Sequence, residues 1–180
     1  MGAQLWYHEA PWHPDAAKAL EALQAQFLAE NYDLSTFLPQ HLAWAREAAA
    51  ATRAEGDPYG LLDMYQDKVT LLERLCSQPI PESPAAQIDI IRQISADSGE
   101  GVGNVLDILR VSPKRGLAKA QRLSKPETVR LVGAAQPTLA QARKAVGKIN
   151  EELGRGESVC FPVYARGKPV GWYFVGNTID

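Results

Sequence analysis

The sequence lacks the features that mark membrane proteins, disulfide-rich secreted proteins and proteins with a cleaved leader. It has only two cysteines, Cys76 and Cys160, and each lies in an apolar pattern that predicts a buried, reduced thiol. No apolar run approaches the length of a membrane span, and the first residues lack the basic and apolar segments of a signal peptide. We therefore expect a cytoplasmic protein without membrane association.

Signatures of catalysis and of cofactor binding are also missing. The sequence has no Gly-x-Ser-x-Gly motif that would present a nucleophilic serine. The glycine-rich stretch 98–104 resembles a phosphate-binding loop, but it lacks the Gly-Lys-Ser/Thr ending and follows a predicted helix instead of a strand. We interpret it as a loop whose glycines adopt positive φ angles, and we expect no cofactor and no bound metal.

Aromatic residues are absent between Tyr65 and Phe161, and this gap bears on nucleic-acid binding. The gap contains a basic run that could follow a phosphate backbone: Arg110, Lys114, Arg115, Lys119, Arg122, Lys125 and Arg130. Single-stranded nucleic acids also require aromatic side chains on which their bases stack, and the run has none. With an isoelectric point near 5.9, nucleic-acid binding is not favoured, and a solvated basic face is expected.

The charges are distributed unevenly along the chain. Residues 1–104 carry 6 Lys and Arg against 15 Asp and Glu, a balance of −9. Residues 105–180 carry 13 against 6, a balance of +7. Such asymmetry indicates either charged partners or two layers of the protein that attract one another.

The best-defined element is a β-hairpin near the C-terminus, formed by residues 158–164 and 170–176. Apolar and other residues alternate in both segments, as in half-buried strands. A turn at Arg166-Gly167 places six large apolar residues on one face by pairing Val163 with Val170, Phe161 with Trp172, and Val159 with Phe174. Because Arg is unfavourable in a left-handed turn position, a longer loop is the alternative.

The prolines of this hairpin predict its place in a sheet. Pro162 and Pro169 both fall in non-hydrogen-bonded pairs, where the N–H group that proline lacks would point away from the partner strand. Pro162 therefore predicts that strand 158–164 is a sheet edge. Strand 170–176 is free to accept a neighbour, and the short aromatic segment 4–8 is the candidate.

Four helices are expected in the first half of the chain, starting at Pro14, at Asp33, at Pro58 with Asp57 as its cap, and at Ser83. Pro39 should kink the second helix or delay its start. The third carries a core seam: Leu62, Tyr65, Val69, Leu72 and Cys76. For the fourth helix a buried strand is the alternative, because its apolar run is short.

The second half mixes strands and helices. Residues 105–111 and 117–123 are expected to form a hairpin around Pro113. Ser124 with Glu127, and Thr138 with Gln141, fit capping boxes that begin two helices, the second of which is amphipathic and ends at Gly154.

These elements predict an α+β fold, with an N-terminal helical half followed by a mainly antiparallel sheet of about five strands and one or two packed helices. One domain, 1–180, is expected. Its sub-regions are residues 1–97, mainly helical with a short N-terminal strand, and residues 104–180, with the sheet.

Two regions are candidates for chemistry or binding. His8, Glu9 and His13, with Glu100 brought near by the glycine loop, could serve as acid and base or hold a metal, although their spacing matches no known metal helix. The second region is the other face of the terminal hairpin. It carries Tyr164, Tyr173 and Val175, with Trp12 nearby, and forms an aromatic binding patch unless a second layer, such as helix 139–153, covers it.

Two functional hypotheses follow. The first is a protein-binding module, in the form of an inhibitor or immunity-type partner of another bacterial protein, because catalytic signatures are absent and an aromatic patch is predicted. The second is a small enzyme with an acid–base or metal site around His8, Glu9 and His13. The sequence predicts neither the identity of a partner nor the oligomeric state.

Overall fold

The computed structural model describes residues 4–96 and 101–178. It confirms the α+β class, with six α-helices and one five-stranded sheet in the described residues. The chain divides into two compact units, residues 1–27 with 99–180 and residues 28–98. The single domain expected from the chain's length stays a prediction. In the described part of the chain, no helix combines the length and apolar character needed to cross a bilayer.

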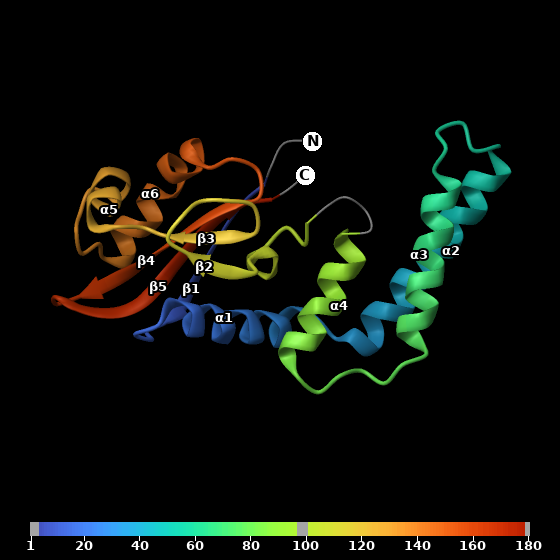
Figure 1. Ribbon diagram of the computed structural model, residues 1–180, viewed down its shortest axis with the longest axis horizontal. Helices are drawn as coiled ribbons and strands as arrows, with labels where there is room; N and C mark the ends of the chain where they lie inside the picture. The colour runs from blue at the N-terminus through green and yellow to red at the C-terminus, as the bar shows by residue number, and fades with distance from the viewer. Residues whose placement is uncertain (1–3, 97–100, 179–180) are drawn as a thin grey trace. The chain divides into compact units, whose positions relative to one another are not determined.

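The first unit, here called the sheet unit, is built on a mixed sheet (Figure 1). The strand order is β1-β5-β4-β3-β2. The pairs β1·β5 and β5·β4 are antiparallel, whereas β4·β3 and β3·β2 are parallel. The strands are β1 (Leu5–Pro11), β2 (Arg110–Ser112), β3 (Lys119–Arg122), β4 (Glu157–Ala165) and β5 (Lys168–Asn177).

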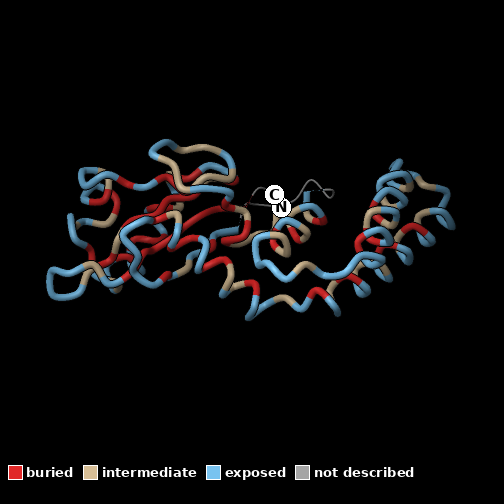
Figure 2. Tube along the Cα trace, turned by 60° about the horizontal axis from the view of Figure 1, so that its bottom comes forward, coloured by how far each residue is buried: buried red, intermediate tan, exposed pale blue. Residues whose placement is uncertain are grey.

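Helices cover both faces of this sheet, and the strands carry many of the unit's buried positions (Figures 1 and 2). On one face lie residues 16–27 of helix α1 (Ala16–Asn31) and the short 3-10 helix η1 (Val105–Asp107). The buried Gln24 of α1 donates hydrogen bonds to the carbonyl oxygens of Val105 and Ile108. The other face is covered by α5 (Lys125–Val132) and α6 (Leu139–Glu152), whose apolar residues pack on β4 and β5.

The terminal hairpin is confirmed, but its predicted register is wrong beyond the turn. Arg166 and Gly167 form a two-residue turn with φ angles of 50° and 75°, so Arg is accommodated in the left-handed region and no longer loop is needed. A bulge then leaves Val170 unpaired, and Val163 pairs with Gly171. The extra residue shifts the register by one position and reverses the faces of the remaining β5 residues.

The predicted edge is also wrong, while the predicted neighbour is confirmed. Strand β4 lies inside the sheet, between β5 and β3, and β1 pairs with β5 from Leu5 to Pro11. Pro162 is tolerated because β3 pairs with β4 only as far as Cys160. Beyond that point no ladder on the β3 side requires the missing N–H group.

The expected hairpin of residues 105–123 is wrong as well, because β2 and β3 are parallel. Residues 105–107 form η1, capped by the side chain of Asn104. The loop that follows β2 leads back to the start of that strand, where the N–H group of Leu109 donates to the carbonyl oxygen of Ala118. Strand β3 is then joined to the parallel β4 through α5 and α6, the long crossover that parallel strands require.

Both capping boxes of the crossover are confirmed. Ser124 Oγ accepts the Glu127 N–H, and the Glu127 carboxylate accepts the Ser124 N–H. Thr138 and Gln141 make the same reciprocal pair at the start of α6. Helix α5 ends at Gly133, whose φ of 86° is readily adopted only by glycine.

The second unit contains α2 (Leu34–Ala54), α3 (Leu62–Cys76) and α4 (Pro84–Ala96). Asp33 caps α2 as predicted, and the strand alternative for α4 is wrong. Pro39 lies inside α2 without delaying its start. Asp57 Oδ1 accepts N–H groups at the start of α3, which therefore begins four residues later than Pro58.

The buried side of α3 differs from the predicted seam, because two of its buried residues lie one position before the predicted ones. Leu72 is buried as expected, but the other buried residues are Lys68 and Leu75. Lys68 is accommodated because its ammonium lies 5.3 Å from the centre of the Trp44 ring. Cys76 is exposed, which corrects its predicted burial, whereas Cys160 is buried. Neither cysteine forms a disulfide.

Candidate functional site

The predicted binding face of the hairpin is covered by a helix. Tyr173 and Val175 have no exposed surface and pack with Phe161 and with Val146 and Ile149 of α6. The face predicted from the sequence is therefore divided: α6 lies over Tyr173 and Val175, which are not available to a partner, whereas Tyr164 is not part of this covered cluster. The cause is the bulge in β5, which turns Tyr173 and Val175 toward α6.

Trp12 and Tyr164, the other two predicted binding residues, remain accessible. Trp12 is 38% exposed and Tyr164 is partly buried. The Trp12 ring stacks on the ring of Trp172, with centroids 5.7 Å apart and an interplanar angle of 8°. The guanidinium of Arg122 lies 5.2 Å from the centre of the Trp172 ring. Trp172 itself is completely buried, and its Nε1–H donates to the carbonyl oxygen of His13.

Arg122 also lines a surface cavity of about 250 Å³, here called the Arg122 pocket. The pocket lies where β3 ends and α5 begins, beside the part of β4 that extends beyond β3. Crevices at the carboxyl ends of parallel strands are frequent ligand sites in sheets with crossover helices. Its lining residues are Arg122, Leu123, Ser124, Lys125, Thr128, Ala135, Pro162 and Tyr164.

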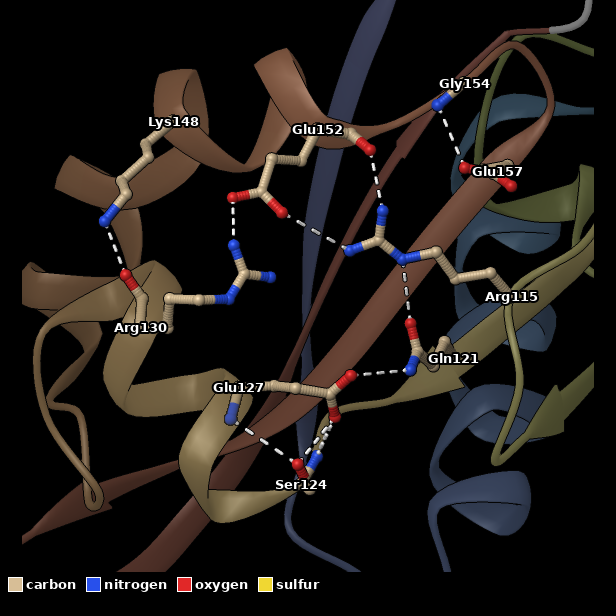
Figure 3. Close-up of polar contacts among 9 residues, drawn as sticks. All are labelled: Arg115, Gln121, Ser124, Glu127, Arg130, Lys148, Glu152, Gly154 and Glu157. Carbon is tan, nitrogen blue, oxygen red and sulfur yellow. Dashed lines mark hydrogen bonds and ion pairs between the residues drawn. The ribbon is translucent and has the colours of Figure 1, made fainter.

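Two cations of the basic run are neutralised by a carboxylate within the sheet unit (Figure 3). Arg115 and Arg130 form ion pairs with Glu152 of α6. Arg115 also donates to Gln121 Oε1 and to the carbonyl of Glu152, and Lys148 donates to the carbonyl of Arg130. These contacts tie β3, α5 and α6 together, so we assign them a structural role.

Arg122 and Lys125 differ from these residues. Neither forms an ion pair with any residue that the structure describes. Glu127 follows closely in the chain, but its carboxylate bonds to Ser124 and to Gln121, which lies on the other face of β3 from Arg122. The hydrogen bonds from Ser124 are the main reason why the pKa of Glu127 is lowered. The Arg122 pocket therefore presents two uncompensated positive charges.

The cluster around His8, Glu9 and His13 does not form one site. Strand β1 alternates its side chains, so His8 and Glu9 lie on opposite faces of the sheet. The His8 ring lies 5.0 Å from the ring of Phe27, whereas Glu9 Oε1 lies 2.7 Å from Arg143 Nη2 of α6. Burial lowers the pKa of His8.

Of the other two members of that hypothesis, the structure describes only His13. His13 lies after β1, where the Asp15 N–H donates to its ring Nδ1, and its carbonyl oxygen accepts the Nε1–H of Trp172. Glu100 lies outside the described residues. Among residues 4–96 and 101–178, no three His, Cys, Asp or Glu side chains could together hold a metal ion.

The glycine-rich stretch binds a carboxylate of the protein itself. The N–H groups of Val102 and Gly103 donate to the two oxygens of Asp107, at 2.6 and 2.8 Å. A phosphate would need these same donors. Residues 101–104 therefore support the interpretation as a structural loop, while residues 98–100 lie outside the described part.

The second unit has a larger cavity, about 390 Å³, between α3, α4 and the loop that joins them. Its lining is mainly apolar and includes Leu38, Leu75, Ile80 and Ile90, with Arg74 as its one charged residue. This cavity carries less chemical information than the Arg122 pocket, because it offers few groups that would select a ligand.

Sequence reasoning found the basic run but not the special position of Arg122 within it. One local signal existed, because Arg122 ends a predicted strand directly before a capping box. Its contact with Trp172, 50 positions later in the numbering, depends on tertiary structure. No protein-family model, curated protein or solved structure matches this chain, so its proposed function rests on this geometry.

Proposed function

We propose that this protein is a protein-binding module that receives an acidic side chain of its partner in the Arg122 pocket. The observation that carries the proposal is the pair of uncompensated cations, Arg122 and Lys125, in one cavity with the partly buried Tyr164. An arginine guanidinium binds a carboxylate through two parallel hydrogen bonds, which gives it specificity as well as affinity.

The size of the pocket favours a side chain over a cofactor. Its volume of about 250 Å³ is below the roughly 300–1,000 Å³ of typical small-molecule sites. The N–H group of Glu127 at the start of α5 is already taken by the capping box, and the side-chain donors that the pocket offers include Arg122, Lys125 and Tyr164. An Asp or Glu side chain on a protein surface matches these donors in charge and size.

The neighbouring tryptophans support recognition of a protein. Trp12 is partly exposed beside the Trp172–Arg122 contact, and aromatic and arginine side chains are enriched among residues that dominate binding energy at interfaces. An inhibitor or immunity-type role is a narrower form of this proposal, in which binding suppresses the partner's activity. The cytoplasmic location expected from the reduced cysteines stays a prediction.

The proposal is tested by selecting binders from a random peptide library displayed on phage. The wild-type protein should enrich peptides that carry Asp or Glu at a fixed position. These peptides should bind Arg122→Gln and Lys125→Gln about tenfold to a hundredfold more weakly, because each variant removes a charge-assisted hydrogen bond worth about 1.5–3 kcal/mol.

Lys114→Gln is the matched control, because Lys114 belongs to the same basic run, is exposed and does not line the pocket. Its affinity for the peptides should be unchanged. Lys125 is exposed as well, so its replacement tests the pocket even where Arg122→Gln disturbs the packing of Trp172. Enriched peptides without an acidic preference, or equal binding to all three variants, would show that the pocket does not recognise carboxylates.

A further inference from the structure

Strand β1 is an edge of the sheet, and among the described residues no strand pairs with its outer side. It pairs only with β5, through seven residues from Leu5 to Pro11. Leu5 is 37% exposed and Tyr7 is 52% exposed, and Glu9 and Pro11 are exposed as well. A long exposed edge of this kind is a template for a further strand.

The hydrogen-bond pattern shows which backbone groups point outward. Thr178 N–H donates to the carbonyl of Gln4, so the pair Gln4–Thr178 is of the hydrogen-bonded type. In an antiparallel ladder this type alternates, so Trp6, His8 and Ala10 bond to β5. The N–H and C=O groups of Leu5, Tyr7 and Glu9 therefore point away from β5, and they have no backbone partner in the described part of the chain.

Strand β1 itself carries few of the features that usually prevent strand addition. Edges are commonly protected by lysines, by prolines, by bulges or by a covering segment. Strand β1 contains no Lys or Arg, its Pro11 lies at the last position, and its pairing with β5 has no bulge. Its one carboxylate, Glu9, is neutralised by Arg143 of α6.

We propose that a second copy of this chain pairs with β1, antiparallel and centred on Tyr7, to give a continuous sheet across a two-fold axis. In this register Tyr7 faces Tyr7 of the second copy, and Leu5 faces Glu9. Each of these pairs consists of residues whose backbone groups point outward, so every outward N–H group of Leu5, Tyr7 and Glu9 gains a carbonyl partner.

The side chains favour this register over its neighbours. Two aromatic rings meet at the centre, which stabilises cross-strand pairs. The two Glu9 residues stay apart, whereas a register centred on Glu9 would place like charges opposite each other. A register centred on His8 would place the outward groups of Leu5 opposite Pro11, which has no N–H to donate.

The dimer has a consequence for the Arg122 pocket. A two-fold axis through an antiparallel strand pair runs perpendicular to the sheet, so both copies present the same face on the same side. Two pockets would then open on one side of the continuous sheet, and a partner with two acidic sites would bind with increased avidity. The dimer itself does not depend on the function proposed for the pocket.

The register is tested by disulfide trapping in the full chain carrying Cys76→Ser, which removes the exposed native thiol. Directly opposed residues of a hydrogen-bonded pair have Cα atoms about 5.5 Å apart, within the range that a disulfide spans. Under mild oxidation Tyr7→Cys should form a covalent dimer. Leu5→Cys and Glu9→Cys alone should not, because their copies lie about 13 Å apart along the strand, whereas the double variant Leu5→Cys/Glu9→Cys should.

Sedimentation of the unmodified protein provides the second measurement. Its mass should rise with concentration from 19.7 kDa toward twice that value, and Tyr7→Lys should keep it monomeric. Tyr59→Lys is the control, because Tyr59 is 83% exposed and lies in the other unit, and it should leave the dimer intact. A monomer at all concentrations without trapping of Tyr7→Cys would overturn the proposal, as would trapping of Leu5→Cys or Glu9→Cys alone.

Discussion

Replacing Tyr173 by Phe is expected to stabilise the sheet unit. The side chain has no exposed surface, and its hydroxyl finds no hydrogen-bond partner among the described residues. Burial, with smaller contributions from Tyr7 and Glu9, raises the pKa of Tyr173 to about 12. Leaving a buried polar group unsatisfied costs about 1–3 kcal/mol. Phenylalanine removes that cost and keeps the ring, which lies 5.8 Å from the ring of Phe161.

We expect a gain of about 1 kcal/mol, which raises the melting temperature of a protein of this size by about 2–4 °C. Urea denaturation measures the gain, followed by tryptophan fluorescence in a Trp44→Phe background, because the remaining tryptophans all lie in the sheet unit. Tyr7→Phe is the control, since Tyr7 is 52% exposed, and it should change the free energy of unfolding by less than about 0.5 kcal/mol.

A loss of stability in Tyr173→Phe would refute this reasoning, because it would mean that the hydroxyl has a partner in the folded protein. No change at all would indicate that the hydroxyl reaches water, as expected if the face between β5 and α6 were open. The experiment therefore also tests whether α6 seals the predicted binding face.

Two further predictions concern β1 and β5. Gly176→Ala should destabilise the sheet unit by about 1–3 kcal/mol in urea denaturation, because the added Cβ would lie 2.2 Å from a ring carbon of Trp6. Unchanged stability would show that Trp6 can move aside. Burial lowers the folded-state pKa of His8, so the unfolded chain binds its proton more readily. The stability from neutral His8 is complete above about pH 6.5 and is lost as the pH falls toward the folded pKa. His8→Gln should reduce this loss between pH 7.5 and 5.5, and an identical pH profile in both proteins would contradict it.

Signals that act over a few residues predicted much of the fold. The capping boxes at Ser124 and Thr138 begin helices as expected, and Asp33 caps α2. The terminal hairpin and its turn at Arg166-Gly167 were also predicted, because alternation and turn position are local properties.

The errors arise where pairing depends on distant segments. One unpaired residue, Val170, exchanges the two faces of β5, and alternation alone does not reveal a bulge. The parallel pairing of β3 with β4 requires α5 and α6 to act as a crossover, which no local pattern distinguishes from a hairpin followed by helices. Pro162 was interpreted as an edge signal although β3 simply ends before it.

The candidate site was predictable only in part. Trp12 and Tyr164 remain accessible as expected, but Tyr173 and Val175 are buried because they follow the bulge. Arg122 was one of seven similar cations in the sequence. Only the structure shows that Glu152 neutralises two of the others and that, of the five without an ion pair in the described residues, Arg122 and Lys125 line one pocket.

The central claim, that the Arg122 pocket recognises a carboxylate, is tested most directly by a double-mutant cycle measured with titration calorimetry. An enriched acidic peptide and its counterpart with Glu replaced by Gln are titrated into the wild-type protein and into Lys125→Gln. The replacement should weaken binding to the wild type about tenfold or more and weaken binding to Lys125→Gln clearly less, because the two charges interact directly. An equal loss on both proteins would mean that the carboxylate binds elsewhere and would contradict the account.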